Sequence, residues 1–323
     1  MQHKKKHLFA LALALSAIVA VASFVAKAGH GQTPSTSDKT LSDKSAVTAL
    51  KPTASVRERR AATPATEKSA HAFGEAVARN SQLKYELTWA FGGKQQRGWY
   101  LYVPLISRLL ETEGEAAGGD FAGALARWQS SAGLRADGVL DDETLYRMVS
   151  DWQGARLKDK SDPRPDQLLV APVADFYDPS RPEELRQVER ETYAAYKRMV
   201  AAALEDPSLG LKKTKAGELA SEEKFLKIVS SFRSREYQEH LRRQSPNSGR
   251  AGLAVNSPHF TGRALDIYVG GEPVETKDAN RALQVQTSVY KWLVRNADRF
   301  GFRPYYYEPW HWEYVGMTAS ASK

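Results

Sequence analysis

Residues 257–268 read Ser-Pro-His-Phe-Thr-Gly-Arg-Ala-Leu-Asp-Ile-Tyr. The second half of this stretch predicts a short strand over 264–269, in which Asp266 faces away from its apolar neighbours because side chains alternate along a strand. His259 precedes the strand, in a loop that Pro258 and Gly262 interrupt. One imidazole and one carboxylate are therefore expected close together.

A second stretch near the C-terminus has the same character. Residues 308–312 read Glu-Pro-Trp-His-Trp, and a strand is predicted over 311–315. His311 would face away from the two tryptophans that flank it. If this strand lies beside the first, His259, Asp266 and His311 can converge on one point.

Two histidines and one carboxylate can bind a zinc ion by three contacts and leave a fourth position for water. Glu308 lies three residues before the last of these ligands. A carboxylate there could take a proton from the water. The two stretches together predict a hydrolytic zinc site.

The surrounding sequence predicts an α+β domain, with a small antiparallel sheet and flanking helices. The predicted helices cover 183–204, 221–228, 234–243 and 280–300. The predicted strands cover 229–232, 264–269, 302–307 and 311–315.

The N-terminus is typical of an export signal. Lys4 to Lys6 precede an apolar run from Leu8 to Ala26, and small residues at 26 and 28 suit a signal peptidase. Residues 1–28 are therefore predicted to be a signal peptide, although an uncleaved membrane anchor is the alternative. Residues 29–71, rich in small and polar residues, are predicted to be a flexible linker.

Residues 72–153 are predicted to form a helical domain, followed by a linker over 154–183. In this domain Phe121, Leu125 and Trp128 recur at helical spacing, and an Asp-Gly turn at 137–138 precedes a second helix. From about residue 103 to 153 the pattern resembles the three-helix peptidoglycan-binding domain found beside many wall hydrolases.

The C-terminal stretches also resemble a known family. Ser257, His259, Gly262, Ala264 and Asp266, followed by Glu308-Pro-Trp-His-Trp, are similar to the zinc D-alanyl-D-alanine carboxypeptidases of the VanY type, members of the LAS group of peptidoglycan metallopeptidases. The upstream segment 230–238, Ser-Ser-Phe-Arg-Ser-x-x-x-Gln, matches the family pattern except that Ser-Phe replaces Gly-Tyr. The resemblance places a zinc carboxypeptidase domain at 184–316 and leaves a tail at 317–323.

The resemblance also implies roles for individual residues. His259, Asp266 and His311 would bind zinc, and Glu308 would be the catalytic base. Arg233 would lie in the active site, either beside the developing oxyanion or on the terminal carboxylate of the substrate, two roles that the sequence leaves open. Gln238 and Ser257 would lie near the substrate.

The resulting hypothesis is an exported enzyme, periplasmic or associated with the cell wall, that removes the terminal D-Ala of peptidoglycan stem peptides. It would act as a monomer, with peptidoglycan as its partner, and it would contact a membrane only through an uncleaved anchor. A D,D-dipeptidase, a peptidoglycan endopeptidase and a non-catalytic wall-binding protein remain alternatives.

Composition limits the other possibilities. The chain has 323 residues and no cysteine, which excludes disulfides, thiolate metal sites and a cysteine nucleophile. Removing the four lysines of residues 1–28 from the formal charge of +8 leaves +4, a mild positive balance that suits an acidic wall polymer. No basic stripe with interleaved aromatic residues indicates a nucleic-acid partner.

Overall fold

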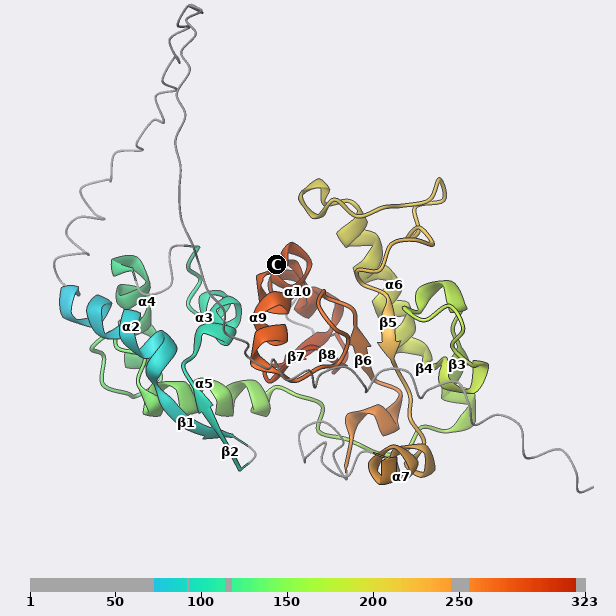
Figure 1. Ribbon diagram of the computed structural model, residues 1–323, viewed down its shortest axis with the longest axis horizontal. Coiled ribbons are helices and arrows are strands. Elements are labelled where there is room, and N and C mark those ends of the chain that lie inside the picture. Colours follow the sequence, from blue (N-terminus) through green and yellow to red (C-terminus); the bar gives the residue numbers. More distant parts are fainter. Residues whose placement is uncertain (1–72, 92, 114–117, 245–255, 318–323) are drawn as a thin grey trace, which may run out of the picture. The chain divides into compact units, whose positions relative to one another are not determined.

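The computed structural model describes residues 73–317, except for 92, 114–117 and 245–255 (Figure 1). All of these residues belong to one compact unit, which spans residues 60–323. The predicted signal peptide and the whole of the predicted linker over 29–71 lie outside the described residues. None of the helices in the described part of the chain combines the length and the apolar character that crossing a bilayer requires.

The C-terminal domain is built around a four-stranded antiparallel sheet, which confirms the predicted α+β class. Its strand order is β5-β6-β8-β7. The strands are β5 (Ile228–Ser230), β6 (Ala264–Ile267), β7 (Phe302–Tyr305) and β8 (Glu308–Tyr314). The order places β6 directly beside β8, as the convergence of the three candidate ligands requires (Figure 1).

Helices and short 3-10 turns surround this sheet. The α-helices of the domain are α6 (Arg190–Leu204), α7 (Arg235–Gln244), α9 (Asp278–Gln286) and α10 (Ser288–Asn296). The 3-10 turns are η4 (Glu183–Leu185), η5 (Pro207–Leu209), η6 (Pro258–Thr261) and η7 (Ala297–Phe300). Helix α7 confirms the prediction for 234–243.

Two helix predictions were wrong in extent, and a third helix does not form. The helix predicted over 280–300 breaks at Thr287, whose backbone is extended and whose hydroxyl accepts from Tyr290 N, so that this residue caps α10. The helix predicted from residue 183 begins only at Arg190, because Glu189 caps α6. No helix forms over 221–228, where the carboxylate of Glu223 accepts the backbone N–H groups of residues 212, 224 and 225 in a turn.

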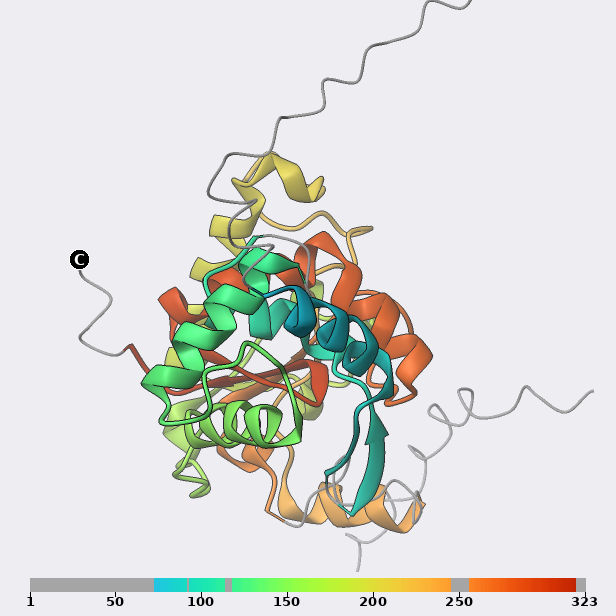
Figure 2. The same cartoon turned by 90° about the vertical axis from the view of Figure 1, so that its left-hand side faces the viewer.

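In the N-terminal region, 73–157, the described residues form four α-helices and one hairpin. The helices are α2 (Gly74–Glu86), α3 (Val103–Leu109), α4 (Gly119–Ser131) and α5 (Asp142–Gly154), with the 3-10 turn η1 (Tyr100–Tyr102) before α3. The hairpin pairs β1 (Thr88–Phe91) with β2 (Lys94–Arg97) and lies below α2 in Figure 2. This hairpin departs from the all-helical prediction for 72–153.

The sequence pattern that joins α4 to α5 has a physical basis. Gln129 of α4 accepts from Gly138 N and donates to Val139 O and to Thr144 of α5, and so ties both helices to the turn between them. Gly138 has a φ of +72°, and a Cβ atom there would lie 2.6 Å from Ala122 O. Glycine is therefore required at this turn. Asp141 caps α5, and the inner face of this helix is buried, with Leu145, Met148 and Val149 among its residues.

Residues 154–183, for which the sequence predicts a linker, contain ordered structure. The 3-10 turns η2 (Pro165–Gln167) and η3 (Val173–Asp175) flank β3 (Leu168–Val170), which pairs with β4 (Gln187–Glu189). The predicted domain boundaries stay predictions.

A single hydrophobic cluster runs through the N-terminal region and the C-terminal domain. The ring of Tyr102 lies 5.5 Å from that of Tyr306, and Phe91 of the hairpin lies 5.2 Å from Tyr307. The hydroxyl of Tyr102 also accepts from the guanidinium of Arg281, which is 1 % exposed. The two parts of the chain therefore share one core beside the sheet.

Candidate metal centre

The pairing of β6 with β8 places a carboxylate opposite an imidazole. Asp266 and His311 are cross-strand partners, and the next pair along the strands is Leu265 with Trp312. Because side chains alternate, the polar pair faces one side of the sheet and the apolar pair packs on the other. Both polar side chains are buried.

His259 is brought to the same point by η6. Ser257 caps this turn by accepting His259 N, and Gly262 closes it by donating its N–H to His259 O. Gly262 has a φ of +69°, and a Cβ atom there would lie 2.9 Å from the side chain of Leu168 and 3.0 Å from Glu189 N. The tight left-handed turn returns the chain to the start of β6 with the imidazole pointing inward.

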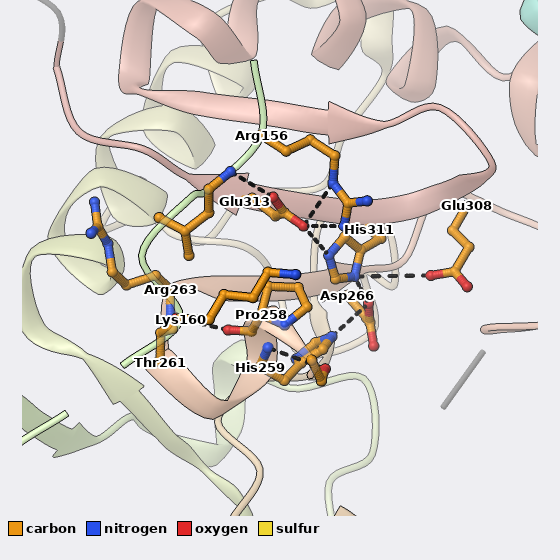
Figure 3. Close-up of polar contacts among 12 residues, drawn as sticks. Arg156, Lys160, Pro258, His259, Thr261, Arg263, Asp266, Glu308, His311 and Glu313 are labelled. Atoms are coloured by element: carbon orange, nitrogen blue, oxygen red, sulfur yellow. Dashed lines mark hydrogen bonds and ion pairs between the residues drawn. The ribbon is translucent and has the colours of Figure 1, made fainter. Parts of the chain in front are cut away.

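The three side chains meet in a buried cluster (Figure 3). Asp266 Oδ1 lies 2.9 Å from His311 Nδ1 and 3.3 Å from His259 Nε2. One ligand atom from each residue lies within 4.8 Å of the others, so that a single ion could contact all three.

The hydrogen bonds of His259 show which of its ring nitrogens can face a metal ion. Its Nδ1 lies 2.7 Å from the carbonyl oxygen of Ser231 and must donate to it, which leaves a lone pair on Nε2. That Nε2 atom is buried without a hydrogen-bond partner and faces a carboxylate oxygen. Burial, helped by the nearby Arg233, lowers the pKa of His259 to about 4, so no proton separates the two acceptors at neutral pH. A divalent metal ion fits this position.

His311 is oriented in the same way by another acceptor. Its Nε2 lies 3.1 Å from Glu313 Oε1, which leaves Nδ1 to face Asp266. Burial lowers the pKa of His311, but hydrogen bonds to Asp266 and Glu313 outweigh this effect and raise the pKa to about 9. The same imidazoles hold the pKa of Asp266 well below its usual range despite its burial.

Glu308 begins β8 and lies on the other side of His311 from Glu313 (Figure 3). Its Oε2 is 4.0 Å from His311 Nδ1, and the side chain is buried. Burial raises the pKa of Glu308 to about 7. A carboxyl group in this state can both accept and return a proton near neutral pH.

Arg233 reaches the second oxygen of the shared carboxylate. Its Nη2 lies 3.1 Å from Asp266 Oδ2, and its Nη1 donates to Gln238 Oε1 at 3.1 Å. Its Nε is buried without a hydrogen-bond partner. Arg233 therefore occupies Oδ2 and leaves Oδ1 of Asp266 facing both imidazoles.

The structure thus brings the predicted metal ligands together, with Glu308 and Arg233 beside them. Gln238 contacts Arg233, and Ser257 caps the turn that carries His259. Both residues lie next to the site through these contacts. Their predicted roles toward a substrate stay predictions.

Sequence reasoning missed Glu313 and Arg156. The carboxylate of Glu313 is completely buried, and its Oε1 accepts from Nε of Arg156 at 3.0 Å and also from Nη2 of that arginine. Its Oε2 accepts from Leu157 N at 2.9 Å. Two-residue periodicity on β8 could have placed Glu313 on the face of His311, but no local pattern identifies Arg156.

Comparison with known proteins agrees with the geometry. Residues 185–317 match the family model of VanY, described as D-alanyl-D-alanine carboxypeptidase. No curated protein matches the chain. The matched residues include the three candidate ligands, Glu308 and Arg233, whereas Arg156 lies outside them. Residues 185–317 of this chain therefore form a domain of the VanY family of D-alanyl-D-alanine carboxypeptidases.

Proposed function

We propose that this protein is a zinc-dependent D-alanyl-D-alanine carboxypeptidase that removes the terminal D-Ala from peptidoglycan stem peptides. The family supports the reaction. One observation supports the metal: two buried imidazoles direct one nitrogen each at a shared carboxylate, while the other nitrogen of each ring is bound to an acceptor. Two histidines and one carboxylate are the protein ligands of many hydrolytic zinc sites.

Zinc held by His259, Asp266 and His311 would act as a Lewis acid on the scissile carbonyl and would lower the pKa of water. The side chain of Glu308 would take the proton of the attacking water. It then returns that proton to the nitrogen of the departing D-Ala, which leaves as a neutral amine. The raised pKa of Glu308 suits both steps.

Arg233 supplies a fixed positive charge next to the same carboxylate. The pairing of Arg233 with Asp266 orients the ligand oxygen. The positive charge of Arg233 would also stabilise the negative charge that develops on the carbonyl oxygen of the substrate. The alternative role, binding of the terminal carboxylate of the substrate, uses the same guanidinium. Gln238 holds Arg233 in place, and with Ser257 it is proposed to line the substrate side of the site.

Two further parts of the proposal concern location. The helices of the N-terminal region are proposed to bind peptidoglycan and so to raise the effective concentration of stem peptides at the catalytic site. The N-terminal residues are proposed to direct export to the periplasm or the cell wall.

Mass spectrometry of products from a stem pentapeptide tests this proposal. The zinc-loaded protein is expected to release one alanine, and a chelator is expected to abolish the release. Glu308→Gln should keep zinc and lose roughly 10²- to 10⁴-fold in kcat, because it removes the proton acceptor. Glu205→Gln, at an exposed residue paired with Lys213, is the matched control and should keep full activity. Release of a dipeptide would replace the carboxypeptidase with a D,D-dipeptidase, and unchanged activity of Glu308→Gln would remove Glu308 from the mechanism.

A further inference from the structure

We propose that Arg156, which follows α5 and lies outside the matched residues 185–317, is a positioning residue for the metal ligand His311. It acts through Glu313. This inference rests on the proposed metal site, and it assigns to the N-terminal region a role in building that site in addition to any role in wall binding.

The contacts form a continuous chain from α5 to the ligand (Figure 3). The guanidinium of Arg156 donates twice to Glu313 Oε1, and the same oxygen lies 3.1 Å from His311 Nε2. The next backbone N–H, that of Leu157, donates to Glu313 Oε2. Both oxygens of the buried carboxylate are therefore held by residues 156 and 157.

Arg156 is itself fixed before it reaches the carboxylate. Its Nη1 donates to Gln153 Oε1 of α5 at 2.9 Å. Its guanidinium lies 3.9 Å from the ring centroid of Tyr305 on β7, a cation–π distance. Because these two contacts already fix the guanidinium, it donates to Glu313 with little further loss of side-chain freedom. A lysine could not make the same set of contacts.

This arrangement decides which nitrogen of His311 faces the metal. If Nδ1 is to offer a lone pair, the proton of the neutral ring must lie on Nε2, and Nε2 then needs an acceptor. Glu313 is that acceptor. Without Arg156 its buried carboxylate would lose its cationic partner, and its orientation toward His311 would no longer be fixed.

The support for His259 differs, because its Nδ1 donates to a backbone carbonyl, that of Ser231, within the matched domain. Among the described residues, the two that hold the acceptor of His311, Arg156 and Leu157, precede the matched residues. Residues 185–317 alone would therefore lack the donors that fix Glu313.

The test measures zinc affinity of the full chain by competition with a chromophoric chelator, together with the Tm of the metal-free and zinc-loaded protein. Arg156→Ala is expected to weaken zinc binding roughly 10- to 100-fold, the usual effect of removing a residue that orients a ligand. Arg156→Lys should recover part of this loss, because it keeps the charge but not the two-point contact. Cobalt-substituted Arg156→Ala should show an altered visible spectrum.

Arg108→Ala is the matched control. Arg108 also belongs to the N-terminal region and pairs with an acid of the C-terminal domain, Asp298, at 3.2 Å. This pair is exposed at Arg108 and includes none of the candidate metal ligands. Its zinc affinity and cobalt spectrum should equal those of the unmodified protein.

Wild-type zinc affinity in Arg156→Ala, with only a lower Tm of the metal-free protein, would overturn the proposal in favour of a purely structural ion pair. Should the alanine variant not fold, Arg156→Gln carries the same test: weakened zinc binding supports the role and unchanged binding overturns it. If the unmodified protein binds no zinc, the proposed metal site fails first, and the role of Arg156 falls with it.

Discussion

The two imidazoles of the metal centre are supported by different parts of the molecule. Nδ1 of His259 is hydrogen-bonded to the backbone carbonyl of Ser231, and His259 lies in a turn that Gly262 closes. Nε2 of His311 is hydrogen-bonded to the side chain of Glu313, and that carboxylate accepts from Arg156 in another region of the chain. One imidazole is therefore oriented by a backbone carbonyl, whereas the orientation of the other requires a contact between residues far apart in the sequence.

Asp266→Ala breaks both halves at once and should have the largest effect. The variant removes the carboxylate that faces both imidazoles and leaves the buried cation of Arg233 without its partner. We expect zinc binding to be lost and the free energy of unfolding of the metal-free protein to fall by about 3–5 kcal/mol. Urea denaturation measures this change.

Asp298→Ala is the control for that experiment, because Asp298 pairs with arginines at a partly exposed position. Its loss should cost less than about 1 kcal/mol. If the two substitutions lowered the free energy of unfolding equally, the buried cluster would contribute no more to stability than the Asp298 ion pairs.

Zinc itself should stabilise the assembled site. A ligand that binds only the folded state adds about 2.7 kcal/mol to the free energy of unfolding when its concentration is 100 times its Kd. The same gain should be absent in Asp266→Ala, and it should shrink in Arg156→Ala at a fixed zinc concentration. An identical gain in all three proteins would mean that zinc binds elsewhere.

Gly262→Ala disturbs the His259 half alone. A left-handed backbone costs an alanine about 1–2 kcal/mol, and the added Cβ would also press on Leu168 and on the backbone of Glu189. We expect weaker zinc binding together with lower stability, measured by chelator competition and thermal unfolding.

Gly210→Ala separates these two effects. Gly210 has a φ of +62°, but nothing lies within 4 Å of an added Cβ atom. The Gly210→Ala variant should be destabilised by the backbone strain but should keep full zinc affinity. If both glycine variants bound zinc equally well, the turn at Gly262 would not be what positions His259.

Much of the candidate site could be predicted from the sequence, because it depends on short-range pattern. Two-residue alternation placed Asp266 and His311 on defined faces of β6 and β8, and the adjacent pairing of these strands then brought them together. The chemistry of the donor set supplied His259 and Glu308, and the resemblance to a family supplied Arg233. The α+β class followed from the mixture of helical and strand patterns.

The remainder depends on contacts that no local pattern encodes. Arg156 and Glu313 are separated by 157 positions, and the first lies in a segment whose prolines and charges predicted only a linker. The break at Thr287 likewise arises from tertiary context, since its hydroxyl also donates to Val269 O at the end of the strand region. A threonine in a helical pattern gives little warning of such a bond.

Anomalous diffraction at the zinc edge, from crystals of the zinc-loaded full chain, tests the central claim most directly. We predict one peak at about 2.0–2.1 Å from both His259 Nε2 and His311 Nδ1, and at about 2.0–2.2 Å from an oxygen of Asp266. His311 Nε2 should remain bound to Glu313. A zinc peak on the Glu313 side of His311, or none near these three residues, would contradict the account.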